Sequence, residues 1–443
     1  MVSKGDMSTR QVNVDRKTPM LLPPDMREWV AQDDLAHFVL EAVESVDCSC
    51  AAVNVRGSGS AQYPPAMMLG VLIYCYATGT FSSRRIERAS YQNLSVRYLS
   101  ADTHPDHDTI ATFRRQNGEL IRRAFVEVLE LAQAMGMLRM GTICLDGTKM
   151  RAAASKRATW RASEIEQELA RLEAEAQWRL AAAEKADAVA EPDEQRLPRV
   201  LAGREQRRVK LEAARRLLEE RVRQRAAQRQ AERAEDEEGP GEPPRPLPPT
   251  PRPQDAINTT DADSGLMPTA REGFVQGYNA QLAVSVEGGL IVAARVSHAP
   301  NDRRQLVPTV AALPASLGAP EAILVDTGYD NQRQIAHVEQ HLGATVYCPP
   351  QKSGRSRQVG RLSRAQQRTQ QARARMRQRL ESVAGRALYR LRGQVVEPAI
   401  GIIKSVLGFR GFRLRGLKAV NVEWQLMALA FNCKRLATVV AGG

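Results

Sequence analysis

Two short apolar runs, each followed at once by an aspartate, constrain the fold of this chain more than any other feature. The first run covers residues 141–145 and leads into Asp146, and the second covers 322–325 and leads into Asp326. Short apolar runs bounded by turn residues are typical of buried strands. We therefore expect two buried strands that each end in an aspartate and deliver both carboxylates to one point.

A third acid, Glu397, lies on a helical pattern late in the chain. The adjacent apolar stripe consists of Val396, Ile400, Ile403 and Leu407. Because proline is awkward inside a helix, the helix is expected to begin near Val395 or to kink at Pro398. Three convergent carboxylates suit two Mg²⁺ or Mn²⁺ ions, which prefer oxygen ligands. Two such ions can clamp the attacking and leaving oxygens of a phosphodiester displacement.

Each of these acids also has a plainer interpretation. A single aspartate at a strand end is usually a turn or cap residue, and a single helical glutamate is usually solvated. Three other acids compete for the same role. Asp302 is interpreted as the N-cap of the helix after the third strand, Asp330 as a turn or helix-cap residue, and Asp263 as part of a Ser/Gly-rich loop.

The charge balance favours a polyanionic partner. Lys and Arg number 63 against 50 Asp and Glu, a formal net charge of +13. Nucleic acid is the first candidate for such a partner. Residues 351–380 hold many Lys and Arg and no acid, so this basic block is expected to be loose until it holds a phosphate backbone. A solvated disordered segment is the alternative.

Cysteine and hydropathy patterns exclude several classes of protein. The six cysteines are scattered, and only Cys48 and Cys50 lie close together, so a zinc site is not expected. No apolar run reaches about 18 residues, the length that a membrane helix needs. The first residues carry no signal-peptide core. We therefore expect a soluble, cytoplasmic protein without membrane contact.

The amino-terminal part, residues 26–138, carries helical patterns. One apolar helix follows Pro64, a second has Ser82 as its N-cap candidate, and a third is expected to start at Asp108. Short capped helices with exposed arginines fit a helix-turn-helix-like DNA-binding module. A plain helical bundle with a solvated basic face fits equally well.

The middle of the chain has the composition of an insertion. Residues 161–236 are dominated by Ala, Glu, Arg, Leu and Gln with helical spacing, which predicts two long helices folded as a hairpin. A proline-rich linker follows at 238–253. From residue 273 the period becomes two, which predicts strands at 274–286, 290–296, 322–325 and 345–348, with a helix at 306–317. The order predicts a mixed α/β sheet with helices on its faces.

The motifs together resemble those of bacterial insertion-sequence DDE transposases, which have an RNase H-like catalytic core. The matching stretches are residues 145–149, 277–281, 299–306, 325–330, 396–404 and 408–417. Residues 105–115 resemble the amino-terminal domain that accompanies this group. Each stretch is weak evidence alone, but their common order makes the resemblance specific.

The resemblance implies a fold and a division into domains. The expected fold is an α/β RNase H-like mixed-sheet core, with an all-α amino-terminal domain and an inserted helical hairpin. Residues 1–138 would form the DNA-binding amino-terminal domain, residues 139–160 and 254–443 the split catalytic domain, and residues 161–253 the insertion.

The resemblance also implies the site. Asp146, Asp326 and Glu397 would be the metal-binding triad, holding two Mg²⁺ or Mn²⁺ ions. Related transposases carry a Tyr, Arg, Glu, Lys signature around the last acid, and Tyr389, Arg392, Glu397 and Lys404 fit it. The interval between Arg392 and Glu397 is one residue longer than in the best-known relatives, which leaves Arg390 as the alternative.

Lys404 is assigned with the triad to catalysis, since it shares a helical face with Glu397; a surface lysine is the plainer interpretation. The candidate DNA-binding residues are Tyr389, Arg392, Lys404, Arg373, Arg375, Arg377, Arg379, Arg114 and Arg115.

The implied activity is metal-dependent DNA strand cleavage and strand transfer. The partners would be double-stranded DNA, namely the terminal inverted repeats and the target, bound by a homodimer associated with the nucleoid. Two alternatives stay open: a metal-dependent nuclease without strand transfer, and a non-enzymatic DNA-binding protein derived from a transposase.

Overall fold

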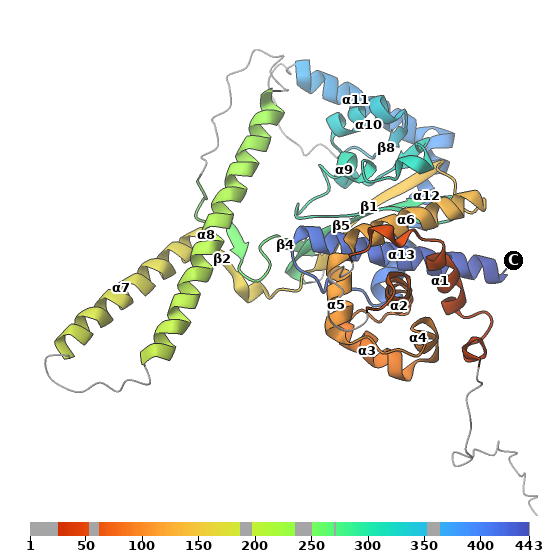
Figure 1. Cartoon of the computed structure of the whole chain (residues 1–443). Coiled ribbons are helices and arrows are strands. Elements are labelled where there is room, and N and C mark those ends of the chain that lie inside the picture. The colour runs from red at the N-terminus through yellow and green to blue at the C-terminus, as the bar shows by residue number, and fades with distance from the viewer. Residues whose placement is uncertain are drawn as a thin grey trace, which may run out of the picture.

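The computed structural model describes residues 25–52, 62–186, 197–234, 250–269, 272–351 and 364–442. These residues form a mixed α/β body from which two long helices project (Figure 1). Within the described ranges, no helix is long and apolar enough to cross a membrane. The proline-rich linker expected at 238–253 lies mostly outside these ranges.

The sheet is centred on β1 (Thr142–Arg151). On one side β5 (Gly273–Ser285) runs antiparallel to it, and on the other side β7 (Ala322–Leu324) and then β8 (Thr345–Tyr347) run parallel. Two further strands, β4 (Gly265–Thr269) and β6 (Ile291–Ser297), pair antiparallel with β5. This mixed order is compatible with the RNase H-like core that the sequence implies.

Helices cover both sides of the sheet. In Figure 1, α9 (Leu306–Val310), α10 (Gln332–Leu342) and α11 (Arg364–Glu381) lie on one side, and α6 (Gly118–Ala134) and α13 (Leu417–Gly442) lie on the other. The long helix α12 (Val383–Gly401) packs against β1 and β5. The central strands are therefore covered by helices from distant parts of the sequence.

Helix α13 also completes the outer edge of the sheet at β6. The side-chain amide of Asn432 accepts from the Ile291 N–H and donates to the Ile291 carbonyl, both at 2.8 Å. Asn421 makes the same pair of bonds with Val296, at 2.7 and 3.3 Å. An edge strand exposes unpaired backbone groups, and these two amides satisfy part of that edge. They fix α13 against the sheet.

The amino-terminal helices share one continuous core with the sheet. They are α1 (Leu35–Glu44), α2 (Pro65–Ala77), α3 (Ser83–Gln92), α4 (Leu94–Leu99), α5 (His107–Gln116) and α6. Helix α2 is apolar on all sides and is buried, as such helices are. It packs between α1 and α13, so α13 contacts the sheet on one side and the amino-terminal helices on the other.

Aromatic side chains fill the junction between these two parts. Phe409 contacts Tyr76, Phe81 and Trp424 with ring centroids 5.0–6.1 Å apart. Phe409 belongs to the Phe-Arg-Gly-Phe-Arg stretch at 409–413, whose phenylalanines are buried and whose Arg410 and Arg413 are exposed. The phenylalanines of this motif therefore pack in the core, and its arginines are exposed to solvent.

The insertion has a separate small core. Helix α7 (Ala162–Ala186) follows the short strand β2 (Thr159–Arg161). Helix α8 (Leu197–Ala234) precedes β3 (Ala256–Asn258), which pairs with β2. Ile165, Leu172, Leu211 and Leu218 form the centre of a buried cluster that is distinct from the main core. Ion pairs Glu175–Arg204 (2.7 Å) and Glu168–Arg207 (2.9 Å) also join the two helices. The two long helices expected at 161–236 are therefore present.

Several expected element boundaries are wrong. Strand β1 does not end at Asp146 but continues to Arg151, because β5 pairs with it throughout. Helix α5 begins at His107, since Asp106 caps the Asp108 and Thr109 N–H groups. The helix expected at 306–317 is interrupted: α9 ends at Val310, and a 3₁₀ turn, Ala315–Leu317, follows Pro314.

The expected start near Val395 is also wrong. Helix α12 begins at Val383, with Ser382 as its N-cap, and runs through Pro398. A π-helical turn, Ile402–Val406, follows directly. Glu397 therefore projects from within a long helix, more than three turns after its start.

Candidate active site

Asp146 lies on β1, and Asp326 lies two residues after the end of β7, the parallel strand beside it. The register of β1 and β7 pairs Cys144 with Leu324. Continued by two residues, this register puts Asp146 level with Asp326, which follows the end of β7. The Asp326 side chain also accepts the Gly328 N–H at 2.9 Å, which fixes the turn that it begins. The sheet therefore brings together the two aspartates that were expected to meet.

Helix α12 carries Glu397, and Arg392 on the same helix links Glu397 to Asp146. Arg392 donates to the Asp146 carboxylate at 2.9 Å and reaches Glu397 at 3.5 Å. The Arg392 side chain is 14% exposed, and that of Glu397 is 60% exposed. Tyr389, on the same helix, donates its hydroxyl to the Val325 carbonyl at 3.1 Å, one residue before Asp326. Of the two candidate arginines, Arg392 is the one at the aspartates.

Burial and neighbouring acids raise the pKa of both aspartates. Burial raises the pKa of Asp146 to about 6, although Arg392 opposes the shift; Asp326 and Asp302 raise it further. Burial likewise raises the pKa of Asp326, against the influence of Arg392. Carboxyl groups that are desolvated and close to other acids favour the protonated form. Arg392 and Lys149 together do not fully compensate this negative charge, so the site favours an additional cation.

Asp302 is a further acid at this site, and its expected role is wrong. The N-cap of α9 is Gln305, not Asp302. The Asp302 carboxylate instead accepts from the side-chain amides of Asn279 and Gln281 on β5, both at 2.7 Å. A side chain at Gly147 would collide with these groups. Glycine therefore lets Asp302 approach the strand that carries Asp146.

Two lysines border the acids. Lys149, on β1, lies 3.7 Å from Asp302, and burial lowers its pKa. Lys404 donates to the Lys149 carbonyl at 3.0 Å. Burial also lowers the Lys404 pKa, and the Lys149 charge adds to this effect. The sequence alone gave no role to Lys149 and only a capping role to Asp302, although both stand inside matching stretches, at 145–149 and 299–306.

The donor set fits a hard divalent cation in its chemistry. Asp146, Asp326 and Glu397 offer carboxylate oxygens, which Mg²⁺ and Mn²⁺ prefer. Among the described residues, no three acidic, histidine or cysteine side chains gather closely enough to surround one ion. Glu397 pairs with Arg392 and is largely exposed. The two aspartates are thus the assembled part of the donor set.

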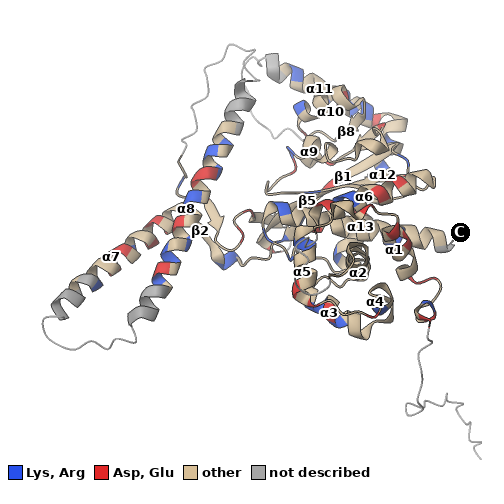
Figure 2. Cartoon of the chain, in the orientation of Figure 1, with Lys and Arg blue, Asp and Glu red and all other residues tan. Residues whose placement is uncertain are grey.

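The basic block is partly structured. Residues 352–363 lie outside the described ranges, and residues 364–381 form α11, so the expectation of a loose segment is wrong there. Two of its arginines are anchored: Arg373 pairs with buried Asp330 at 2.8 Å, and Arg379 pairs with Glu339 at 2.5 Å. Arg375 and Arg377 are exposed on the same helix, whose blue segments Figure 2 shows.

The remaining candidates and rival acids lie elsewhere. Arg114 is 4% exposed and donates to the Tyr76 hydroxyl and the Phe81 carbonyl, at 2.8 and 2.9 Å, whereas its neighbour Arg115 is exposed. Asp330 is the buried partner of Arg373 and does not cap α10, whose N-cap is Asn331. Asp263 accepts the Leu417 N–H at 2.8 Å and pairs with Arg221.

Two protein-family models match the chain. Residues 24–116 match a transposase domain (DUF772), and residues 255–433 match a transposase DDE domain. The second range includes Asp326, Arg392 and Glu397 but begins after β1, which carries Asp146. No curated protein and no solved structure matches the chain. Families of this kind act on DNA and generally use divalent metal ions. With both transposase domains in the expected order, together over more than half of its length, the chain belongs to the insertion-sequence DDE transposases.

Proposed function

We propose that this protein cleaves DNA strands at the ends of an insertion sequence and joins the freed 3′ ends to target DNA, in a reaction that depends on Mg²⁺ or Mn²⁺. One observation carries the proposal: two partly buried carboxylates, Asp146 and Asp326, lie at neighbouring strand positions with raised pKa values and incomplete compensation. Glu397 completes the donor set from α12 when its side chain turns from Arg392 toward the aspartates.

The cations beside the carboxylates suit the phosphate of the strand to be cut. Within the described part of the chain, Lys149 Nζ and Arg392 Nε have no hydrogen-bond partner although both atoms are buried. Each therefore keeps a donor for a phosphate oxygen, and charge-assisted bonds of this kind are strong. Lys404 holds the backbone of Lys149 in place by donating to its carbonyl.

The bound divalent ions would activate water or a 3′-hydroxyl and stabilise charge on the leaving oxygen. Within the protein, Asp146 and Asp326 are held by the sheet, and Tyr389 ties α12 to the backbone beside Asp326. These rigid supports fix the separation between the strand carboxylates and the helix that carries Glu397. Precise placement of this kind contributes much of the rate in phosphoryl transfer.

The test uses the full chain, Mg²⁺ and labelled duplexes taken from the DNA that flanks its gene. We expect nicked strands and joined products with the wild type. Asp146→Asn, Asp326→Asn and Glu397→Gln should each abolish both products, because each removes a charged ligand and preserves shape. DNA binding, followed by fluorescence anisotropy, should survive.

Asp263→Asn is the matched control, because Asp263 is a rival acid outside the site and asparagine keeps its acceptor for Leu417. It should cleave like the wild type. Cutting without joining would indicate a nuclease, and binding without cutting would indicate a non-enzymatic DNA-binding protein. Cleavage retained in Asp326→Asn would remove that residue from the site.

A further inference from the structure

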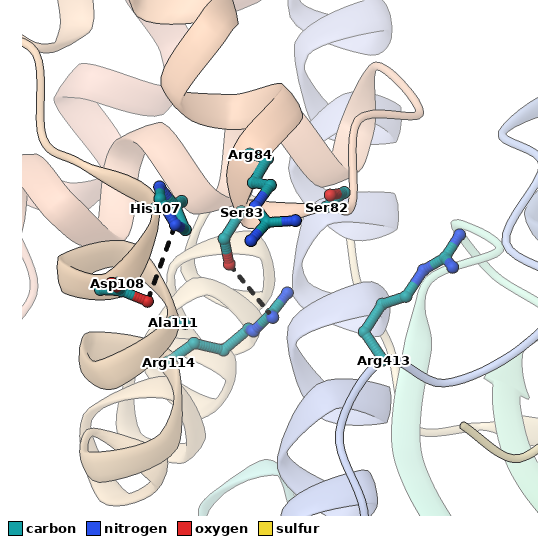
Figure 3. A pocket seen from close by; sticks show the side chains of 8 residues that line it. All are labelled: Ser82, Ser83, Arg84, His107, Asp108, Ala111, Arg114 and Arg413. Carbon is teal, nitrogen blue, oxygen red and sulfur yellow. Dashed lines mark hydrogen bonds and ion pairs between the residues drawn. The ribbon is translucent and has the colours of Figure 1, made fainter. Parts of the chain in front are cut away.

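An open pocket lies where the amino-terminal helices meet the carboxy-terminal segment, away from the three carboxylates. It has a volume of about 300 Å³ and is lined by the start of α3, by α5, and by Arg413 from the segment before α13 (Figure 3). The walls therefore come from both matched transposase domains. None of its lining residues belongs to the carboxylate site or to the cations beside it.

The start of α3 offers unpaired backbone donors to the pocket. Ser82 occupies the N-cap position, but its side chain makes no capping bond. Its carbonyl accepts the Arg85 and Ile86 N–H groups. No acceptor among the described residues pairs with the N–H groups of Ser83 and Arg84. An uncapped helix start of this kind combines free donors with the positive end of the helix dipole, which attracts anions.

A buried arginine provides independent support for a ligand. Arg114 lines the pocket and is more than nine-tenths buried, yet its Nε has no hydrogen-bond partner in the described structure. Its other nitrogens are held by Tyr76, Phe81 and, at 3.4 Å, by the Ser83 hydroxyl. A buried donor without a partner is costly unless a ligand satisfies it. The guanidinium is thus fixed in place with one donor left over.

Two exposed arginines line the same pocket. Arg84 is on the first turn of α3, and Arg413 lines the pocket from the segment before α13, with its guanidinium turned away from Arg84 and Arg114 in Figure 3. In the described ranges neither of them forms an ion pair with an acid, whereas many other arginines of the chain do. Three arginines from separate segments therefore line one pocket, and the charge-assisted bonds that arginine donates suit a phosphate.

The acids near the pocket do not cancel this charge. Asp108 lies on the rim with its side chain 89% exposed, 3.8 Å from His107. Glu87 is paired with the same histidine at 2.8 Å. Buried Glu423 also attracts Arg114, since both side chains bond to the Tyr76 hydroxyl. Three guanidinium groups and a helix start still outnumber these two carboxylates, and solvent screens the exposed one.

A second pocket continues along α3 and favours a polymer as the occupant. It is lined by Arg84, Arg88 and exposed Tyr91, among others, and has a volume of about 290 Å³. A single phosphate ion would fill only the first pocket. A nucleic-acid backbone would continue into the second, where Arg88 offers another cation and Tyr91 an exposed ring.

We propose that the pocket at the start of α3 binds a backbone phosphate of duplex DNA through Arg84, Arg114, Arg413 and the Ser83 and Arg84 N–H groups. This inference rests on the proposed function, since it names where the DNA of that reaction is held. Because Arg413 belongs to the segment that follows the catalytic helix, DNA held here is fixed relative to both transposase domains. The contact is with phosphate, so it positions the duplex and carries no base information.

The test compares two variants of the full chain on the same labelled flanking duplex. Arg84→Gln/Arg413→Gln should weaken binding roughly tenfold near 0.1 M salt and flatten the slope of log affinity against log salt by about 0.9 for each phosphate that the variant no longer neutralises. Both side chains are exposed, so the melting temperature should not change. Arg85→Gln, at the next position of the same helix, is the control and should leave the slope unchanged.

Three results would overturn the proposal. The double variant could bind with the affinity and slope of Arg85→Gln. It could lose discrimination between flanking and random duplex at an unchanged slope, which would make these arginines base readers. Inorganic phosphate could protect the wild type, but not the double variant, from thermal unfolding while DNA affinity stays equal, which would assign the pocket to free phosphate. Failure of the wild type to cut DNA would count against the proposed function instead, because the salt slope is measured without metal.

Discussion

The amino-terminal helices and the α7–α8 hairpin join the same sheet in different ways. Helices α1, α2 and α6 pack on α13 and share its buried side chains, including the Tyr76, Phe409 and Trp424 rings. The hairpin instead has its own small core, and it lies in sequence between the paired strands β2 and β3. Both regions are separate segments in the sequence. Only the hairpin is a separate packing unit.

This difference shows that a change in composition is not the same as a boundary in packing. Burying apolar surface contributes roughly 25 cal/mol for each Å² removed from water. A segment that shares its core therefore cannot be removed without exposing the remainder. Residue 138 ends a helical region of the sequence, but the buried cluster continues across it from Ala36 to Leu436.

The largest expected effect comes from removing each region in turn. Deleting residues 25–138 should expose α13 and leave a chain that aggregates or lacks a cooperative melt. Replacing residues 162–253 with a short flexible linker should leave a folded core, because Arg161 and Ala256 are paired neighbours and closing that loop requires little ordering. Calorimetry of both shortened chains checks this contrast. A hairpin replacement that no longer melts cooperatively would show that the insertion is integral.

The next effect concerns single side chains in the two cores. Glu423 is fully buried, accepts from Tyr76 at 3.0 Å, and accepts the Arg413 and Leu414 N–H groups. Glu423→Ala should lower the free energy of unfolding by about 3–5 kcal/mol, since it leaves a buried polar network without its acceptor.

Ile165→Ala, in the hairpin core, is the comparison for Glu423→Ala. It should destabilise the hairpin alone and leave the main transition in place. Amide hydrogen exchange measured in urea separates the two, because it reports the opening of each helix by itself. A main transition that shifts equally in both variants would contradict the separation of the cores.

A smaller effect divides α11 into an anchored side and an open side. Arg373→Gln/Arg379→Gln should destabilise the protein by about 2–3 kcal/mol, because buried Asp330 is left without its cation. Arg375→Gln/Arg377→Gln should leave stability unchanged and reduce the salt slope of DNA binding by up to about 0.9 for each phosphate that is no longer neutralised. Equal weakening of DNA binding in both pairs would contradict the division.

The smallest effect is a gain in stability at the active site. The pKa of Asp146 in the fold is about 6, above the ordinary value of 3.8, so the folded state holds its proton more tightly. Stability from this group is therefore full below about pH 4 and is lost as pH rises through 6. Without metal, Asp146→Asn should stabilise the protein by on the order of 2 kcal/mol at pH 8 and by nothing at pH 4. Denaturant titrations in EDTA at both pH values check this, and a loss of stability at pH 8 would contradict it.

The sequence predicts the parts of the fold that depend on local patterns. The strands around Asp146 and Asp326, the long helices of the insertion and the helix that carries Glu397 follow from hydrophobic period and turn residues. Their ends do not, because tertiary pairing extends β1 beyond Asp146, and packing carries α12 through Pro398.

The partners of the charged residues could be predicted least. Nothing in the local pattern distinguishes Arg373, which is paired with buried Asp330, from exposed Arg375, since both stand in one basic run. Arg114 follows an ordinary helical pattern, yet its guanidinium is buried among Tyr76 and Phe81. The role of Asp302 could not be distinguished from that of a helix cap by sequence, because its partners Asn279 and Gln281 lie on a distant strand. Such pairings depend on interactions between distant segments.

The most direct test of the account is whether Asp146 and Asp326 hold a divalent ion. Mn²⁺ is titrated calorimetrically into the full chain with its flanking duplex bound, at a pH above 7, which exceeds the Asp146 pKa of about 6. The wild type should release binding heat, and Asp326→Asn should lose it or weaken the affinity at least tenfold while the DNA stays bound. Unchanged Mn²⁺ affinity in Asp326→Asn and Asp146→Asn alike would show that these carboxylates do not form the metal site.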